Sequence, residues 1–288
     1  MKKISNDIEV VEPRMALLYP QEPLKHIEEC ARICCASKSK GSPMDFLADL
    51  LKRGHLSVFE HAAYVPSGKA EESLMRMETT SQPEARAMAS LIRARSTQGF
   101  QTMADLWILN LCSGHELSPI DFLAQAVQGD WEPYKEYKSV RIVCTRGISA
   151  EFERHRTLSP TERSTRYCDA LKGPIQFVMP RPAKWAGDKD SYEYATLLRS
   201  YRHAARSYRS LRYAGASPQY ARDVLGLGLA TTLTLSGSDT WMKVFVMKRY
   251  TPKAHPQAVY LIKQLCDACP ELKDFCKPAD IAKAEEKL

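Results

Sequence analysis

Only four short runs of this chain have the composition of β-strands, and they lie far apart in the sequence. They are VFEHAAYVP at 58–66, SVRIVCTR at 139–146, PIQFVMP at 174–180 and LATTLTLSG at 229–237. The last run is rich in the β-branched residues that strands favour. Longer helical patterns fill most of the chain between and after these runs. Few strands and many helices predict an α+β fold, in which a small, mainly antiparallel sheet packs against several long helices.

The helical patterns have recognisable stripes and caps. Residues 22–36 place apolar side chains on one face of a helix. In GSPMDFLADLLKRG, Ser42 is a suitable N-cap and Pro43 suits the first turn, and the helix is expected to stop at Gly54. Further helices are predicted at 83–96, 118–129, 190–215, 217–226, 238–250 and 255–269.

One sequence pattern occurs twice. SPMDFLADLL at 42–51 returns as SPIDFLAQAV at 118–127, and each copy leads to an expected strand. The repeat is either a local duplication or simply a common way to start a helix, since Ser-Pro-x-Asp provides a cap, a first turn and an early acid.

Composition limits the class of protein. The formal charge of +7 is modest for 288 residues, so clustered arginines indicate an anionic ligand at least as well as a nucleic acid. No run approaches the ~20 apolar residues of a membrane span, and MKKISNDIEVVEP lacks the apolar core of a signal peptide, so a cytoplasmic protein is expected. Nine cysteines suit reduced thiols. Cys266, Cys269 and the nearby Cys276 lack a second ligand pair, and no metal site is expected.

The densest polar run is EFERHRTLSPTERSTRY at 151–167. A segment of helical character, GISAEFERHR at 147–156, is followed by a loop rich in serine and arginine. Guanidinium groups are rigid, two-pronged donors that suit phosphate oxygens, so we expect a phosphorylated ligand rather than only a solvated helix face. A nucleophilic pair of His155 and Ser164 is disfavoured, because neighbouring cations weaken a histidine as a base and no G-x-S-x-G turn is present.

Three motifs resemble those of the flavin-dependent thymidylate synthases. RHRTLSPTERS is Arg-His-Arg, seven residues and Ser, which is the signature of that family. GHLSVFEH at 54–61 is similar to its N-terminal motif, and residues 219–250 followed by HPQ are similar to its C-terminal part. The resemblance covers about 22–66 and 138–268.

The resemblance implies the reaction and its cofactors. Members of this family methylate dUMP to dTMP with methylenetetrahydrofolate as carbon donor, reduced FAD as hydride source and NADPH as the reductant of the flavin. The cofactors then carry the difficult chemistry, and the protein supplies positioning and charge rather than a nucleophile.

The resemblance also assigns site residues by position. The residues implied to bind FAD are His55, Ser57, Arg154, His155, Arg156 and Glu162. Those implied to bind dUMP are Glu151, Arg154, Glu162, Arg163, Ser164, Thr165, Arg166, Arg222 and Arg249. Arg249 is also the implied catalytic residue, because a fixed guanidinium facing uracil favours the ionised N3 form of the base. An ordinary cation at a helix C-terminus is the other interpretation of Arg249.

Four positions depart from the family pattern. Two flavin-contacting asparagines and an arginine are replaced by Ser238, Val244 and Thr240, and a glutamine of the substrate site is Glu151. A carboxylate is unusual beside a nucleotide unless it pairs with an arginine or accepts from an amino group. A relative acting on another pyrimidine nucleotide, such as a cytosine nucleotide, and a non-enzymatic RNA-binding protein therefore remain alternatives.

The segment at about 68–136 is longer than the family's usual connection by about 70 residues. We interpret residues 1–288 as a single flavin-dependent thymidylate synthase-like domain that contains this mostly helical insertion. The insertion either covers the active site, extends an oligomer contact or holds another copy of the first motif near 131–137. The resemblance implies a homotetramer with active sites shared between subunits.

Overall fold

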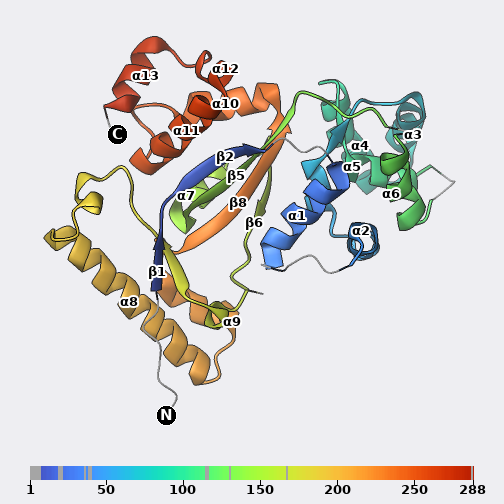
Figure 1. The fold of residues 1–288 in the computed structure, drawn as a ribbon. Coiled ribbons are helices and arrows are strands. Elements are labelled where there is room, and N and C mark those ends of the chain that lie inside the picture. The colour runs from blue at the N-terminus through green and yellow to red at the C-terminus, as the bar shows by residue number, and fades with distance from the viewer. Residues whose placement is uncertain are drawn as a thin grey trace.

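A four-stranded antiparallel sheet forms the centre of the structure (Figure 1). A computed structural model of the chain describes residues 8–18, 22–35, 37, 41–113, 117–129, 131–166, 168–286 and 288. The strands lie in the order β2 (Arg14–Leu18), β5 (Tyr137–Thr145), β8 (Ala230–Ser238) and β6 (Ser159–Glu162). The predicted α+β class, with a small and mainly antiparallel sheet among many helices, is confirmed.

Two pairs of shorter strands lie outside this sheet. β1 (Ile8–Val11) pairs in parallel with β7 (Ile175–Val178). β3 (Ala63–Tyr64) pairs antiparallel with β4 (Gln101–Thr102), so the chain on either side of α3 and α4 is joined by backbone hydrogen bonds.

The largest core lies between the central sheet and four helices. These helices are α7 (Arg146–Phe152), α10 (Asp239–Arg249), α11 (Pro256–Ala268) and α12 (Pro270–Lys273). Val140 and Leu235 of the sheet and Phe245 of α10 are fully buried in it. Burial raises the pKa of Cys266 to about 12 and that of Cys269 to about 11, so both are neutral thiols at pH 7. α13 (Pro278–Glu285) adds Ala284 to this core.

A second core joins the helices on the opposite side of the sheet from α10 and α11 (Figure 1). Its elements are α1 (Pro23–Cys35), α2 (Pro43–Lys52), η1 (Leu56–His61), α3 (Gly68–Thr79), α4 (Pro83–Ser96), α5 (Met103–Leu111) and α6 (Pro119–Gln128). The two copies of the repeated sequence are α2 and α6, which pack against each other. Ser42 and Ser118 cap them as predicted.

A third core contains β7, the long helix α8 (Tyr192–Tyr213) and η4 (Arg222–Leu225), which follows α9 (Pro218–Ala221). Phe177 and Tyr208 are buried there, and Tyr201 stacks on Phe177 with 4.3 Å between ring centroids. Short 3₁₀ turns, η2 (Ala170–Lys172) and η3 (Lys184–Gly187), connect β6 to β7 and β7 to α8. No helix among the described residues is long and apolar enough to cross a membrane.

Two sequence predictions are wrong. The run at 58–66 was predicted to be a strand, but it forms the end of the 3₁₀ helix η1 and then only two strand residues. The helical turn buries the side chains of Val58, Phe59 and His61. The helix predicted over 147–156 ends at Phe152 with Glu153 as its C-cap, so the Arg-His-Arg run lies in turns.

Candidate functional site

The Arg-His-Arg run lies between a short helix and an edge strand. Thr145 ends β5 and caps α7 by accepting a hydrogen bond from Ile148 N at 3.2 Å. After α7, the N–H of His155 donates to Phe152 O and the N–H of Leu158 donates to His155 O, which turns the chain back into β6. β6 then pairs with β8 from Ser159 to Glu162. The motif therefore follows one edge of the central sheet.

Arg249, the last residue of α10, is held by two members of the motif region. Its Nε donates to His155 Nε2 at 2.8 Å, and its Nη1 donates to Glu151 Oε2 at 3.0 Å. Its Nη2 also donates to the backbone carbonyl of Glu151. Only 17% of the Arg249 side chain is exposed. Three acceptors thus fix the orientation of the guanidinium. Because Arg249 pairs with a carboxylate, it is more than an ordinary cation at a helix C-terminus.

His155 acts as a neutral acceptor in this cluster. Burial, followed by the charges of Arg249 and Lys248, lowers its pKa to about 4. Since Nε2 accepts from Arg249, the ring proton is assigned to Nδ1. Phe245 packs edge-on against the ring, with 4.9 Å between centroids. With this lowered pKa and with Nε2 occupied by Arg249, His155 is a weak proton acceptor at pH 7, as the sequence argument against a Ser-His pair expected.

A second group of predicted residues lines a cavity of about 400 Å³. Arg163, Ser164, Thr165 and Arg222 all face this cavity, and Arg222 Nη1 donates to Thr165 Oγ1 at 3.0 Å. The N–H of Ser164 is anchored to Cys34 O at 2.9 Å. Residues that are 57 positions apart in the sequence thus present hydroxyls and guanidinium groups to one space.

The charge of the cavity wall is mainly positive. Arg163, Lys172 and Arg222 contribute cations, and Glu9 and Asp169 contribute carboxylates. Asp169 is already bound, because Arg212 Nη2 lies 2.7 Å from its Oδ2 and Tyr208 donates to its Oδ1 at 2.9 Å. The hydrogen bond from Arg212 lowers the pKa of Asp169. An anionic ligand fits such a wall.

Arg166 is placed beside the cavity, not in its wall. It is exposed, and its N–H donates to Ser164 Oγ at 3.1 Å, which fixes the turn that carries Ser164. Cys168, also in the wall, donates from Sγ to Cys34 O at 3.3 Å.

Glu162, at the end of β6, has one oxygen paired and one buried without a partner. Its Oε2 forms an ion pair with Arg146, while Oε1 accepts no hydrogen bond from the described residues. Burial, together with the neighbouring Glu162, raises the pKa of Glu153. A buried carboxylate oxygen without a donor is a position where a ligand group could bind.

In the first motif, His55 and Ser57 are exposed, whereas His61 is buried beside Thr161 of the arginine motif. His55 and Ser57 lie at the start of η1, directly after Gly54, whose φ of +71° is in the left-handed region. Among the described residues, neither side chain forms a hydrogen bond or ion pair with the arginine motif or with Arg249. The structure therefore gathers most of the predicted residues in three places, which are the Arg249 cluster, the cavity and the start of η1, while Arg154, Arg156, Glu162 and Arg166 lie outside them.

Sequence reasoning missed His61, the last residue of GHLSVFEH. This histidine is 1% exposed, and its ring nitrogens lie 2.7 Å from Ser236 Oγ and 2.8 Å from Thr161 Oγ1. Ser236 in turn contacts Ser139, whose hydroxyl lies 3.0 Å from His26 Nε2. Serine and threonine pointing inward from otherwise apolar strands were the available signal for this buried network.

The residues that depart from the family pattern occupy different environments. Ser238 is buried before α10, and its hydroxyl has no partner among the described residues; Thr240 is exposed, and Val244 is partly buried. Glu151 pairs with Arg249, so its carboxylate is satisfied by the arginine that it was expected to need.

The two arginines of the Arg-His-Arg run are accessible to a ligand. Arg154 and Arg156 are exposed, and within the described part of the chain neither forms an ion pair or side-chain hydrogen bond. Exposed guanidinium groups beside a neutral imidazole could hold a pyrophosphate.

Comparison with known proteins supports the motif resemblance. Residues 134–272 match the family model Thy1, thymidylate synthase complementing protein. This match agrees with the family resemblance recognised from the motifs. The matched segment contains the arginine motif, Arg222 and Arg249, but not GHLSVFEH at 54–61, whose assignment stays a prediction.

Two solved structures are similar over most of the chain. Both are of the UMP/dUMP methylase PolB from Streptomyces cacaoi. The one bound with 5-Br dUMP has 16% identity and a TM-score of 0.44, covering 92% of this chain and 93% of that chain. The one bound with 5-Br UMP has 14% identity and a TM-score of 0.43, covering 92% of each chain. No curated protein matches the sequence.

Proposed function

We propose that the chain is a flavin-dependent thymidylate synthase that methylates dUMP to dTMP. Methylenetetrahydrofolate is the carbon donor in this proposal, and NADPH reduces the flavin. The observation that carries the proposal is the cavity of about 400 Å³, into which the structure brings Arg163, Ser164, Thr165 and Arg222. These residues come from two motifs of one family, and their hydroxyls and cations suit a nucleotide phosphate.

The cavity residues bind and orient the phosphate end of dUMP. Arg222 supplies a charge-assisted hydrogen bond and is itself oriented by Thr165. Ser164 offers its hydroxyl from a turn that is anchored through Cys34 O and the N–H of Arg166. Because this wall is preorganised, binding energy goes into placing the nucleotide, which is the main role left to a protein without a nucleophile.

Arg249 acts on the pyrimidine ring in the proposed site. Its guanidinium stays charged at pH 7 and is fixed by Glu151 and His155. A fixed cation stabilises negative charge at N3 of uracil without needing to reorganise. Arg249 binds only Oε2 of the Glu151 side chain, so this carboxylate can still accept from an amino group, and the comparison of substrates below decides the cytosine alternative.

FAD would be held by the outer face of the motif and, when bound, supplies the hydride that completes the methyl group. Arg154 and Arg156 would bind its phosphates, and His155, His55, Ser57 and Glu162 would complete the contacts. Glu162 Oε1 is the buried acceptor available for a donor on the ligand. A homotetramer with shared sites is part of the proposal, and in it the exposed Arg154, Arg156 and Arg166 would be accessible to a neighbouring subunit.

The decisive experiment is turnover of the purified protein with dUMP, methylenetetrahydrofolate, NADPH and FAD. Mass spectrometry of the nucleotide should show dTMP, and omission of FAD should stop its formation. UMP, CMP and dCMP are the comparison substrates. A methylated cytosine nucleotide instead of dTMP would support the alternative enzyme. A protein that is colourless, does not turn over and binds RNA in a salt-dependent way would refute the enzyme assignment.

A further inference from the structure

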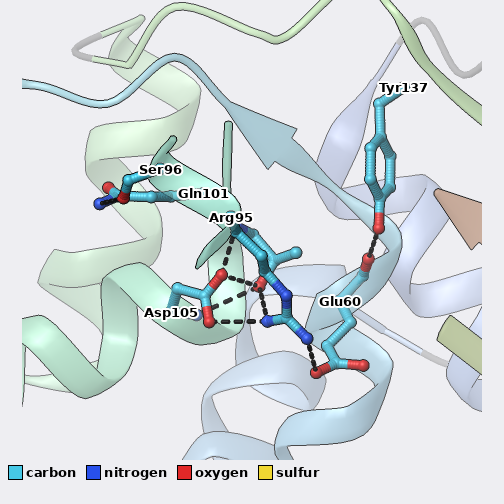
Figure 2. A network of polar contacts seen from close by, with 7 residues as sticks. Glu60, Arg95, Ser96, Gln101, Asp105 and Tyr137 are labelled. Atoms are coloured by element: carbon cyan, nitrogen blue, oxygen red, sulfur yellow. Dashed lines mark hydrogen bonds and ion pairs between the residues drawn. The ribbon is translucent and has the colours of Figure 1, made fainter. Parts of the chain in front are cut away.

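Arg95, near the end of α4, contacts two acidic residues from different elements. Its Nη1 donates to Asp105 Oδ1 of α5 at 2.7 Å, and its Nη2 donates to Glu60 Oε1 of η1 at 3.0 Å. Figure 2 shows the guanidinium lying between these two carboxylates. One side chain of the 68–136 segment thus connects that segment to the motif at 54–61.

The Asp105 end of this link is rigid. Asp105 is 3% exposed and forms a capping box with Thr102, in which Thr102 N donates to Asp105 Oδ2 at 2.9 Å and Asp105 N donates to Thr102 Oγ1 at 3.2 Å. Thr102 belongs to β4, which pairs with β3 directly after η1, and Met103 N donates to Ala62 O at 3.0 Å. Through Thr102 and Met103, Asp105 is therefore joined to the chain directly after η1, the element that Arg95 contacts.

The Glu60 end is held by both its side chain and its backbone. While Arg95 binds the carboxylate, Tyr137 donates from its hydroxyl to Glu60 O at 2.7 Å (Figure 2). In a 3₁₀ helix, residues three apart lie one above the other, so Glu60 lies one turn from Ser57 on the same face. Fixing Glu60 fixes the turn that presents Ser57 and, before it, His55.

Charge supports the same geometry. Burial works against the charge of Arg95, but Asp105 and Glu60 together raise its pKa, so the guanidinium is a permanent cation between two carboxylates. The side chains of Arg95 and Glu60 are 31% and 27% exposed. Removing the cation would leave two carboxylates facing each other, one of them buried, which forces Glu60 and η1 to move.

We propose that Arg95 is a positioning residue, through which the segment at 68–136 holds residues 54–61 in the conformation that binds FAD. The inference rests on the proposed function for the identity of the ligand only. The bracing of η1 is a property of the chain and is testable without flavin. The segment at 68–136 thus supports the flavin-binding motif at 54–61, although it lies outside that motif.

Arg93 provides a matched control on the same helix. It also binds two carboxylates, Glu71 and Glu78, and its side chain is 33% exposed. Both of its partners belong to α3, so its loss removes a similar pair of ion pairs without touching η1.

The test compares Arg95→Gln with Arg93→Gln in the full chain. Hydrogen exchange of the amides at 55–61, measured without flavin, should be about tenfold faster in Arg95→Gln only, because this segment opens more often. The dissociation constant for FAD, measured by quenching of flavin fluorescence, should rise about tenfold in the same variant. At saturating FAD, turnover should recover to nearly that of the parent, since Arg95 does not contact substrate in the proposed site.

The outcomes separate the two proposals. Equal exchange at 55–61 in both variants would overturn the role of Arg95, whatever the flavin result. A parent protein that binds no FAD would overturn the proposed function, while the exchange result still decides whether Arg95 braces η1. If Arg95→Gln does not fold, Glu60→Gln replaces it, because this change breaks the same ion pair and leaves Asp105 paired. Unchanged exchange at 55–61 in Glu60→Gln would likewise refute the inference.

Discussion

Lowering the pH from about 7 to about 5 should destabilise the fold, because His26 and His61 are buried as neutral groups. His26 is 5% exposed and His61 is 1% exposed. Burial lowers the pKa of His26 to about 4, with Glu29 opposing and Arg141 adding to the shift. Burial, and secondly the charge of His26, lowers the pKa of His61 to about 3. Both rings remain unprotonated in the folded chain at pH 5.

The direction and size of this loss of stability follow from the difference in histidine pKa between the folded and the unfolded chain. Unfolded histidine titrates near pH ~6.5, so below that pH the unfolded chain binds more protons and the stability falls as the pH falls. The contribution of each neutral ring is complete above pH ~6.5 and is lost progressively down to its folded pKa. At about 1.4 kcal/mol for each unit, the span from ~6.5 to ~5 gives about 2 kcal/mol per histidine and about 4 kcal/mol for the pair.

Urea unfolding followed by circular dichroism at about pH 7 and about pH 5 measures this loss. The double variant His26→Gln/His61→Gln should be less stable at pH 7 but should lose much less stability on acidification. His203→Gln, at an exposed position of α8, is the control and should behave like the parent. If the double variant loses as much stability as the parent between the two pH values, the buried rings are not the source of the acid sensitivity.

Four further changes test the site and the packing around it. Arg222→Leu should weaken dUMP binding by about 1.5–3 kcal/mol in titration calorimetry, the range for a hydrogen bond to a charged group; an unchanged affinity would argue against the phosphate role. His155→Ala should release FAD on gel filtration, and full retention of flavin with no turnover would assign the ring to chemistry instead. Cys168→Ser should keep measurable dTMP formation despite its place in the cavity wall, whereas a folded, flavin-loaded but inactive variant would indicate a thiol nucleophile. Gly237→Ala would place a Cβ 2.5 Å from Leu158 Cδ2 and should cost about 1–3 kcal/mol of stability in urea unfolding, with wild-type stability as the contrary result.

The helices could be predicted because their signals are local. Ser42 and Pro43 start α2, and Ser118 and Pro119 start α6 in the same way, at positions visible in the sequence. The pattern at 22–36 gave α1 nearly to its ends. Caps and periodicity act within a few residues, so no knowledge of distant contacts was needed.

The strands that were missed depend on distant partners. β2 pairs with β5 from Arg14↔Val143 to Leu18↔Ser139, and β6 pairs with the far end of β8. β6 contains Pro160 and Glu162, a composition that favours a loop, and only the neighbouring strand makes it a strand. In the opposite sense, the apolar run at 58–66 resembles a strand but forms mostly a 3₁₀ helix, because burial of Phe59 and His61 decides its path.

In the candidate site, too, local patterns could be predicted from the sequence and contacts between distant elements could not. The motif pattern named the cavity residues, and the structure brings Arg163, Ser164, Thr165 and Arg222 together. The pairing of Glu151 with Arg249 spans 98 positions, and the link from Arg95 to Glu60 involves a segment for which the family pattern gives no counterpart. Neither contact leaves a local sequence signature, since each depends on how separate elements pack.

The Arg249 cluster explains how a carboxylate can belong to a site that handles anions. Burial lowers the pKa of Arg249, with Glu151 opposing and Arg154 adding to the shift. His155 is neutral, and Lys248 also acts on its ring. Arg154 and Lys248 add positive charge around Arg249 and His155, and Glu151 supplies the carboxylate that pairs with Arg249. In the proposed site, Glu151 therefore orients the guanidinium without cancelling the positive field, and the stabilisation of an ionised pyrimidine comes from the whole cluster and not from Arg249 alone.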